Sequence, residues 1–522
     1  MICVTIARPT HRQMLSDCQS LTSQGISLAE LRLDHLQETP DITALLAGCS
    51  AAKVILTVRK AEDGGIFCGT EEKRRQLLLA AMGSGAEYVD LEDGTAAELP
   101  RRGNAKRLVS FHDFVGTPED LDALYDRLAA QDADLVKIAC MAQTPMDSLR
   151  MLDLVKRKRN AKVPVVGFCM GEMGKPSRIL CQAFGSPFTY CAPSAQDIAA
   201  PGMISWEEMR SLYRAEELTE ETEVFGVIAD PVGHSMSPLI HNSAFIENGL
   251  PDRVYLPLRI PPKDLDAFME MAPKVLKMRG LSVTIPHKEK VIPLLDSVDT
   301  SVKLIAACNT VLWDLNGVSE GTNTDYQAAM SSFAETLSAP GPHHVEGWTE
   351  PLDDPKTGEI LAQPILGKTA MILGSGGVGK ALAIGLARRG AKLILTDIDL
   401  SRAQALAERL AQDGFETQAV DWAVRHEQDA DFLVNCTPIG MSPKVDASPW
   451  DPAHLCPAHV CFDAVYNPEE TLFIRSAKEK GCATVNGLQM FVKQAGLQFE
   501  RFTQTDPPLL RMRAVVKQAL EN

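Results

Sequence analysis

Short apolar runs recur through the first part of the chain, and stretches with helical spacing of apolar positions separate them. The runs are Ile2–Ala7, Leu28–Leu33, Val54–Val58, Tyr88–Leu91, Leu108–Phe111, Leu135–Ala139, Val163–Phe168 and Phe188–Cys191. Runs of this kind are typical of buried parallel strands. Eight of them with helices between predict a (β/α)8 TIM barrel over residues 1–218, so the fold class is α/β.

The pattern starts again at Val224–Ile228, after a charged run, Arg214–Glu223, that predicts a solvated linker. Residues 223–338 are expected to form one lobe, completed by C-terminal helices at about 487–522. Residues 365–486 alternate strand and helix patterns, which predicts a Rossmann-like lobe. The second half of the chain is therefore expected to have two lobes.

The connection between these lobes, residues 339–364, is rich in Pro and Gly and contains His343 and His344 followed by several acids. It is longer than a usual connection, so we expect a mobile surface insertion. A metal site at the two histidines is a minor alternative.

A glycine-rich stretch follows the apolar run Met371–Leu373. It consists of Gly374, Ser375, Gly376, Gly377, Val378 and Gly379, and then Lys380. The stretch matches both G-x-G-x-x-G, which places a pyrophosphate at a helix N-terminus, and the phosphate loop G-x-x-x-x-G-K. The phosphate loop needs Ser or Thr after the lysine, and here that position is Ala381, where we expect the helix to begin. The next strand, Lys392–Thr396, ends at Asp397, which favours a dinucleotide.

Composition narrows the classes of function. A formal net charge of −16 over 522 residues argues against nucleic acid as a partner. No apolar run is long enough to span a membrane, and the N-terminus has no targeting signal, so the cytoplasm is expected. The thirteen cysteines include no C-x-x-C pair, so we expect reduced thiols and no metal. Zinc at Cys456 and Cys461, near His454 and His459, is a distant alternative.

Polar residues at the ends of the predicted barrel strands suggest chemistry. Lys137 lies between apolar neighbours, and desolvation there would leave a neutral amine able to attack a ketone. His112, Arg59 and Arg32 could supply an acid–base group and anion clamps at the same barrel mouth. Taken alone, Lys137 could equally extend from a strand edge into solvent, and His112 could be structural.

The second half carries a further set of candidates. Ser235 and Ser237 are two residues apart and could grip one carboxylate, although a plain serine turn is the simpler explanation. Lys288 follows a strand and a proline, and Asp325 follows Asn323 and Thr324. Brought together, Lys288 and Asp325 would form a proton-transfer pair beside an alcohol or ketone. Separately, each could be a surface charge.

Five motifs in the first half resemble the type I 3-dehydroquinate dehydratases in order and spacing. They are Glu30-x-Arg32-x-Asp34, Leu56-Thr57-Val58-Arg59, Val109-Ser110-Phe111-His112-Asp113-Phe114, Val136-Lys137-Ile138-Ala139 and Ser177-Arg178. The resemblance implies that Lys137 forms a Schiff base with the substrate ketone and that His112 removes the neighbouring proton and assists loss of water. It also implies that the substrate is held by Glu30, Arg32, Arg59 and Arg178.

This half departs from the family pattern at three positions. Ala199 and Met203 stand where the closing loop usually has Ser and Gln, and Asp63 stands where a glutamate is usual. We expect these changes to affect substrate affinity or lid closure rather than the chemistry.

Residues 223–522 resemble shikimate dehydrogenase, again in the family's order. The resemblance covers the motifs above and Asn435 to Met441, Asp463 to Pro468 and Gly487 to Ala495. It implies that Lys288 and Asp325 are the catalytic pair and that Gly487 lies near the nicotinamide. The implied substrate-binding residues are Ser235, Ser237, Thr284, Asn309, Tyr466 and Gln494. Ser282 replaces a common asparagine, and the two serines favour shikimate over quinate.

The family resemblance and the local residues predict different cofactors. Shikimate dehydrogenases usually end the second strand with Asn-Arg-Thr, whose arginine pairs with the 2′-phosphate of NADP. Here the residues are Asp397-Ile398-Asp399, and an acid favours a ribose diol, hence NAD. Arg402 is the nearby cation that could still accommodate NADP.

Together the two halves imply a bifunctional enzyme that dehydrates 3-dehydroquinate and then reduces 3-dehydroshikimate to shikimate. Its partners would be these small molecules, and its oligomeric state is left open. Two alternatives are a Schiff-base aldolase barrel fused to another dehydrogenase, and a metabolite-sensing regulator without turnover. The altered loop at Ala199 and Met203 supports the regulator, whereas the presence of all four proposed catalytic groups argues against it.

Overall fold

The computed structural model describes residues 1–49, 52–340, 342–348, 350 and 359–521. They form two compact units. Unit 1 comprises Met1–Ser235 and Leu250–Met278, and unit 2 comprises Met236–Gly249 and Arg279–Asn522.

Unit 1 is dominated by an eight-stranded parallel sheet in the order β7-β6-β5-β4-β3-β2-β1-β8. The strands are β1 (Ile2–Ile6), β2 (Leu28–Arg32), β3 (Lys53–Thr57), β4 (Tyr88–Glu92), β5 (Lys106–Asp113), β6 (Leu135–Met141), β7 (Val165–Met170) and β8 (Thr189–Cys191). Because β1 pairs with both β2 and β8, the sheet curls into a nearly closed barrel. The predicted (β/α)8 fold is confirmed.

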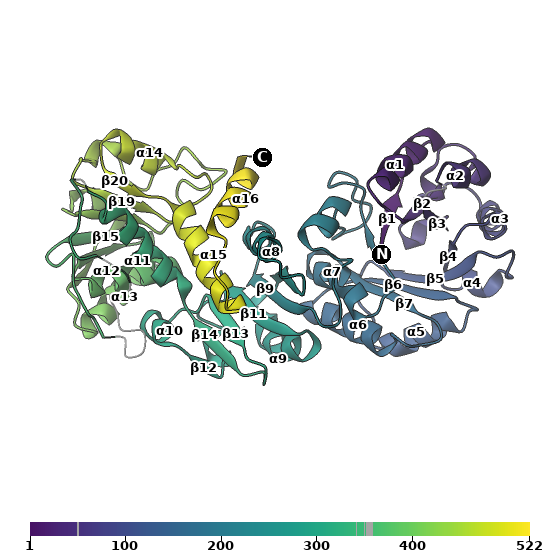
Figure 1. Ribbon diagram of the computed structural model, residues 1–522, viewed down its shortest axis with the longest axis horizontal. Coiled ribbons are helices and arrows are strands. Elements are labelled where there is room, and N and C mark those ends of the chain that lie inside the picture. The colour runs from purple at the N-terminus through teal and green to yellow at the C-terminus, as the bar shows by residue number, and fades with distance from the viewer. Residues whose placement is uncertain (50–51, 341, 349, 351–358, 522) are drawn as a thin grey trace. The chain divides into compact units, whose positions relative to one another are not determined.

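Helices surround the barrel strands (Figure 1). They are α1 (His11–Ser23), α2 (Ile42–Gly48), α3 (Glu71–Met82), α4 (Thr95–Glu98), α5 (Leu121–Ala129), α6 (Pro145–Arg157) and α7 (Lys175–Phe184). On β6, Leu135 and Ala139 belong to a core cluster with Phe188 and Tyr190. Since side chains alternate along a strand, Lys137 shares their face, and Val136 and Ile138 face the other way. This alternation places a charged residue of an apolar-looking strand inside the barrel.

The segment after the barrel differs from the solvated linker expected at Arg214–Glu223. Arg214, Ala215 and Leu218 are buried. Arg214 donates to the carbonyl oxygen of Arg253 at 2.8 Å. The segment is therefore packed in part, because its apolar residues find partners that the charge pattern does not reveal, whereas Glu216, Glu217, Glu220 and Glu221 are exposed as expected. Unit 1 then continues with β9 (Glu223–Ala229), β10 (Arg253–Arg259) and α9 (Leu265–Val275).

Unit 2 contains two groups of strands. In the first, β11 (Met278–Val283), β13 (Thr310–Trp313), β14 (Ser319–Thr322) and β12 (Ser297–Val298) follow one another in the sheet. The second is a parallel sheet of β17 (Thr417–Ala419), β16 (Lys392–Thr396), β15 (Thr369–Leu373), β18 (Phe432–Asn435), β19 (Val460–Asp463) and β20 (Ala483–Val485), in that order. This second sheet is Rossmann-like, as predicted.

The helices of unit 2 are α8 (Ser237–Glu247), α10 (Thr300–Ile305), α11 (Thr324–Leu337), α12 (Gly377–Arg388), α13 (Leu400–Gln412), α14 (Leu472–Glu479), α15 (Gly487–Thr503) and α16 (Leu509–Glu521). Helices α11 and α15 pack along each other, and α11, α12 and the parallel sheet share one core (Figure 1). Helix α12 begins at Gly377, four residues before the predicted start at Ala381. Glycines of the loop join the helix because the amide of Lys380 already bonds to Gly376.

The described part of the 339–364 insertion is anchored rather than a mobile surface loop. Trp348 is 1% exposed and stacks on Phe333 of α11, with ring centroids 5.9 Å apart. The amide of Val345 donates to the carbonyl oxygen of Leu337 at 2.8 Å. Residues 351–358 of the predicted mobile insertion lie outside the described residues.

We predict that Trp348→Ala lowers the free energy of unfolding of unit 2 by about 3 kcal/mol, because it leaves a cavity against α11. The urea midpoint of unit 2 measures this. His344→Ala, at an exposed position of the same insertion, is the control and leaves the midpoint unchanged. Equal midpoints for both variants would contradict the anchored packing.

Candidate active sites

The carboxyl ends of the barrel strands enclose one pocket. It brings together Thr5, Glu30, Arg32, Arg59, Asp63, His112, Lys137, Phe168, Arg178, Tyr190, Ala199, Ala200 and Met203. Every barrel residue singled out in the sequence therefore lines the same site. Met203 and the two alanines give the closing loop an apolar inner surface.

Lys137 lies at the centre of the barrel pocket and is 5% exposed. Its Nζ is 3.5 Å from Asp90 Oδ2, 3.6 Å from Glu30 Oε1 and 4.0 Å from the centroid of the Tyr190 ring. Burial agrees with the sequence expectation, but the surroundings are acidic rather than apolar. Two carboxylates stabilise a positive charge on this nitrogen, which an iminium carries as well as an ammonium.

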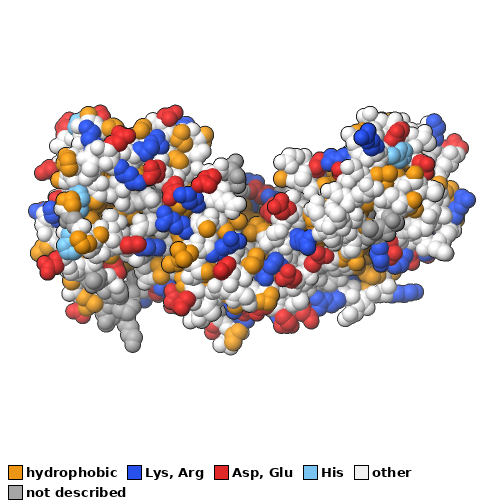
Figure 2. Space-filling model, turned by 45° about the horizontal axis from the view of Figure 1, so that its top comes forward, with side chains coloured by type: hydrophobic (Ala, Val, Ile, Leu, Met, Phe, Trp, Pro, Cys, Tyr) orange, Lys and Arg blue, Asp and Glu red, His pale blue; other side chains and the backbone are white. Residues whose placement is uncertain are grey.

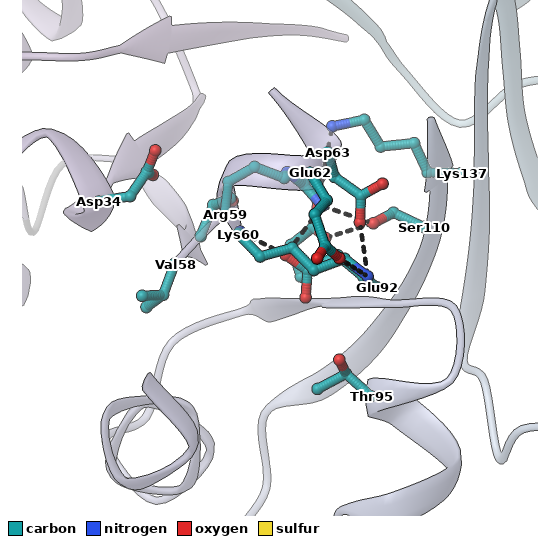
Figure 3. A network of polar contacts seen from close by, with 12 residues as sticks. Asp34, Val58, Arg59, Lys60, Glu62, Asp63, Glu92, Thr95, Ser110 and Lys137 are labelled. Carbon is teal, nitrogen blue, oxygen red and sulfur yellow. Dashed lines mark hydrogen bonds and ion pairs between the residues drawn. The ribbon is translucent and has the colours of Figure 1, made fainter. Parts of the chain in front are cut away.

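A buried network supports Asp90, and Figure 3 shows Arg59 and Ser110, which belong to this network. Arg59 donates to Asp90 at 2.6 Å and to Ser110 at 2.8 Å, and Ser110 donates to the other Asp90 oxygen at 2.6 Å. Burial alone would raise the pKa of Asp90, but the charges of Arg59 and Lys137 hold it well below its usual range. Arg59 thus fixes Asp90, a role that sequence reasoning did not assign.

Glu30 and Arg32 are also held by neighbours. Glu30 accepts a hydrogen bond from Thr5 and another from Thr57, both at 2.8 Å. Arg32 forms a two-point contact with Asp34, at 2.9 and 2.7 Å. These bonds fix the orientation of both side chains at the pocket wall.

Arg178 is the arginine of the barrel pocket that has two spare donors among the described residues. It is 1% exposed and lies over the Phe168 ring at 4.1 Å. Its Nη1 donates to the carbonyl oxygen of Tyr190 at 3.3 Å, whereas Nε and Nη2 have no partner among the described residues. Burial lowers the pKa of Arg178 to about 10, so it remains charged at neutral pH. A buried guanidinium with two spare donors in a pocket is suited to an anionic ligand.

His112 lies at the end of β5, one strand from Lys137. Burial, together with the charges of Arg59 and Lys137, lowers the pKa of His112 well below 6.5. Its Nδ1 has no hydrogen-bond partner within the described part of the chain. The imidazole is therefore neutral at neutral pH and able to accept a proton.

In unit 2, Lys288 and Asp325 meet. Lys288 Nζ lies 2.5 Å from Asp325 Oδ2, with side-chain exposures of 15% and 8%. Asp325 belongs to the first turn of α11, which Asn323 caps by accepting from the amides of Asp325 and Tyr326. The pairing that the sequence suggested is therefore present.

Asn309 secures the same helix start. Its Oδ1 accepts from the Thr324 amide at 2.8 Å, and its Nδ2 donates to the Thr324 hydroxyl at 3.0 Å. Gln498, which sequence reasoning missed, donates to the Asn309 carbonyl and accepts from Ser282 at 2.8 Å. A signal was available, since Gln498 lies one helical turn after Gln494 on α15.

The glycine loop fits a dinucleotide. Gly374 has φ +99°, and a Cβ on Gly379 would meet the Gly374 carbonyl oxygen at 1.9 Å, so both positions require glycine. The buried Ser375 hydroxyl has no partner among the described residues. A Cβ on Gly377 would meet Lys288 Cδ at 3.3 Å, which places Lys288 beside the loop. Lys380 instead pairs with Glu289 at 2.5 Å, unlike the lysine of a triphosphate loop.

Asp397 lies at the end of β16 beside this loop. Its carboxylate accepts from the Ser375 amide at 2.7 Å and from the Asp399 amide at 3.1 Å. Ile398 is 93% exposed, and Arg402 reaches to 3.8 Å from the position of a Cβ on Gly376. Residues around the expected adenosine ribose therefore include a buried acid, an exposed apolar side chain and one arginine.

The remaining residues that the sequence assigned to the second site lie on several different elements of the fold. Tyr466 stacks on Phe491 of α15 at 4.4 Å. Gly487 starts α15 so close to Val465 that a Cβ would meet its carbonyl oxygen at 2.2 Å. Gln494 lies on α15, and Thr284 follows β11. Ser235 lies in the turn before α8, and Ser237 is its first residue.

Fold and sites define a two-site enzyme, a lyase barrel joined to a nicotinamide-dependent dehydrogenase. Residues 2–220 match the family model "Type I 3-dehydroquinase", and residues 227–311 match "Shikimate dehydrogenase substrate binding domain". The chain is 35% identical to the bifunctional 3-dehydroquinate dehydratase/shikimate dehydrogenase of Arabidopsis thaliana, covering 97% of this chain and 83% of that protein. The chain belongs to the bifunctional 3-dehydroquinate dehydratase/shikimate dehydrogenase family.

Two further similarities concern the second half. A shikimate dehydrogenase (NADP(+)) of Pelobacter propionicus is 37% identical, covering 56% of this chain and 95% of that protein. A solved shikimate dehydrogenase in complex with NADP+ is 30% identical with a TM-score of 0.50, covering 58% of this chain and 97% of that one. Within the described ranges, no helix has the length and apolar character needed to cross a membrane.

We predict that the dehydration rate stays flat as pH falls from 8 to 6.5 and declines only at lower pH. A base must be unprotonated, and the lowered pKa of His112 keeps it so at pH 6.5. The profile of kcat against pH measures this, and His112→Ala should abolish the rate across the range. A half-maximal rate at pH 6.5 or above would contradict the burial effect.

Proposed function

We propose that this chain catalyses two consecutive steps, dehydration of 3-dehydroquinate and reduction of the resulting 3-dehydroshikimate to shikimate. The observation that carries the first step is Lys137 between two carboxylates, together with Arg178 in the same pocket, two of whose donors have no partner among the described residues. The observation that carries the second is the Lys288–Asp325 pair beside the glycine loop.

In the barrel, the Lys137 amine attacks the substrate ketone, and loss of water gives an iminium whose charge Glu30 and Asp90 stabilise. Arg178 binds the substrate carboxylate. The neutral His112 takes the proton next to the iminium carbon, and the electron pair then expels the neighbouring hydroxyl, which leaves as water with the proton from His112. Hydrolysis of the imine frees the product and regenerates Lys137.

In the second half, the reduced nicotinamide supplies a hydride to the ketone when the cofactor is bound. Lys288 donates a proton to the carbonyl oxygen, and Asp325 keeps the ammonium in place. Ser235 and Ser237 would bind the substrate carboxylate, while Thr284, Asn309, Tyr466 and Gln494 would orient the ring. Gly487 would lie near the nicotinamide.

For the cofactor, the local chemistry of this chain supports NAD. Asp397 offers a carboxylate to a ribose diol, and the exposed Ile398 offers no cation to a 2′-phosphate. Arg402 and the two NADP-named relatives are the support for NADP. The cytoplasm stays a prediction, since the name of the Arabidopsis relative places that protein in the chloroplast.

We predict that dehydration depends on Lys137 and shikimate oxidation on Lys288, so that each activity can be lost without the other. Borohydride reduction with 3-dehydroquinate should label Lys137 alone in mass mapping, and Lys137→Ala should lose both the label and dehydration. Lys288→Ala should lose shikimate oxidation while keeping the label and the dehydration rate. Lys106→Ala, at an exposed strand position, is the control and keeps both activities. A label elsewhere, or joint loss of both activities in Lys288→Ala, would refute the two-site assignment.

We predict that shikimate oxidation has a kcat/KM about tenfold higher with NAD+ than with NADP+, because Asp397 repels a 2′-phosphate. Ile398→Arg should move the preference toward NADP+, since the position is exposed and adds a cation without disturbing Asp397. Ile398→Gln is the matched control without charge and should leave the ratio unchanged. A strong NADP+ preference in the unaltered protein would show that Arg402 decides the cofactor instead.

A further inference from the structure

Helix α11, which carries Asp325, packs closely on α12, which starts in the glycine loop. A Cβ on Gly385 of α12 would meet Met330 Sδ of α11 at 2.7 Å, so glycine permits this approach. The geometry of Asp325 relative to the loop therefore depends on how these two helices are held together.

Arg389 joins the two helices directly after the end of α12. It is 1% exposed, and its Nη1 donates at 3.0 Å both to the Gly385 carbonyl oxygen and to the Tyr326 hydroxyl. Tyr326 follows Asp325 in the first turn of α11 and is itself buried. The Arg389 guanidinium thus hydrogen-bonds both to the backbone of α12 and to Tyr326, the residue next to Asp325.

Glu350 of the 339–364 insertion holds Arg389 in place. Its two oxygens accept from Arg389 Nε at 2.7 Å and Nη2 at 2.5 Å, a two-point ionic contact. The same carboxylate accepts from Trp348 Nε1 at 2.7 Å, and Trp348 stacks on Phe333. Tyr326 and Phe333 are seven residues apart and so lie on one face of α11. The insertion therefore supports that face of α11 at two positions, at Tyr326 through Glu350 and Arg389, and at Phe333 through Trp348.

We infer that Arg389 is a positioning residue of the reductase, which holds Asp325 at a fixed distance from the glycine loop through Tyr326 and Glu350. This inference rests on the proposed reductase function. Arginine is needed because its planar fork serves Tyr326, Gly385 and Glu350 together, whereas a lysine ammonium cannot span all three. Proton transfer is sensitive to such placement, since a shift of about 1 Å can cost about 100-fold in rate.

Two variants test the inference in the full chain. Arg389→Lys keeps the charge but loses the fork, and kcat for shikimate oxidation should fall by about 100-fold. Tyr326→Phe removes only the hydroxyl and should lower kcat by a smaller factor. In both variants the KM values for shikimate and for the cofactor should stay within about twofold, because the binding groups are untouched. The dehydration rate should equal that of the unaltered protein.

The matched control is Tyr125→Phe in the barrel. Tyr125 is buried, and its hydroxyl donates to the Val163 carbonyl oxygen at 2.6 Å, so this variant also deletes one buried hydroxyl bond. It should leave kcat for shikimate oxidation unchanged. Unchanged kcat in both Tyr326→Phe and Arg389→Lys would overturn the inference, as would KM values that rise in step with the loss of kcat. Absence of shikimate oxidation in the unaltered protein would instead refute the proposed function.

Discussion

Parallel strands of one sheet all end at the same edge, and both halves of this protein depend on that constraint. In the barrel it gathers Lys137, His112 and Arg59 from different strands into one pocket. In unit 2 it places Asp397, at the end of β16, beside the glycine loop at the end of β15. Residues far apart in the chain thereby become neighbours without long loops.

Placing charges inside a barrel requires compensation. Inside the barrel, Lys137 and Arg59 lie beside the carboxylates of Glu30 and Asp90. Ser110 donates a hydrogen bond to Asp90, and two threonines donate to Glu30. The exception is Arg178, whose spare donors lie in the pocket. Uncompensated buried charge is costly, so an anionic ligand bound at this position would lower that cost. Over the surface seen in Figure 2, by contrast, Lys and Arg side chains are interspersed with Asp and Glu.

In the reductase half, hydrogen bonds to the start of α11 hold the proposed catalytic groups in place. Asn323 caps α11, Asn309 and Gln498 hold its start, and Arg389 ties it to α12. Most of these contacts link residues that are distant in sequence. They explain how Lys288 and Asp325 are kept at one separation, which proton transfer requires.

Local patterning was enough to predict the eight barrel strands and the Rossmann-like lobe, because strand periodicity and glycine spacing are local properties. Most of the candidate site residues came instead from motifs that resemble known families. Local patterning could not show that carboxylates surround Lys137, since Asp90 and Glu30 come from other strands. Nor could it show that Trp348 anchors a Pro-rich insertion, or that Arg214 and Leu218 are buried in a charged segment, because burial depends on partners elsewhere in the fold. The sequence by itself thus identified the candidate reactive groups. Contacts between residues that are distant in sequence decided how the buried charges are compensated and how these groups are positioned.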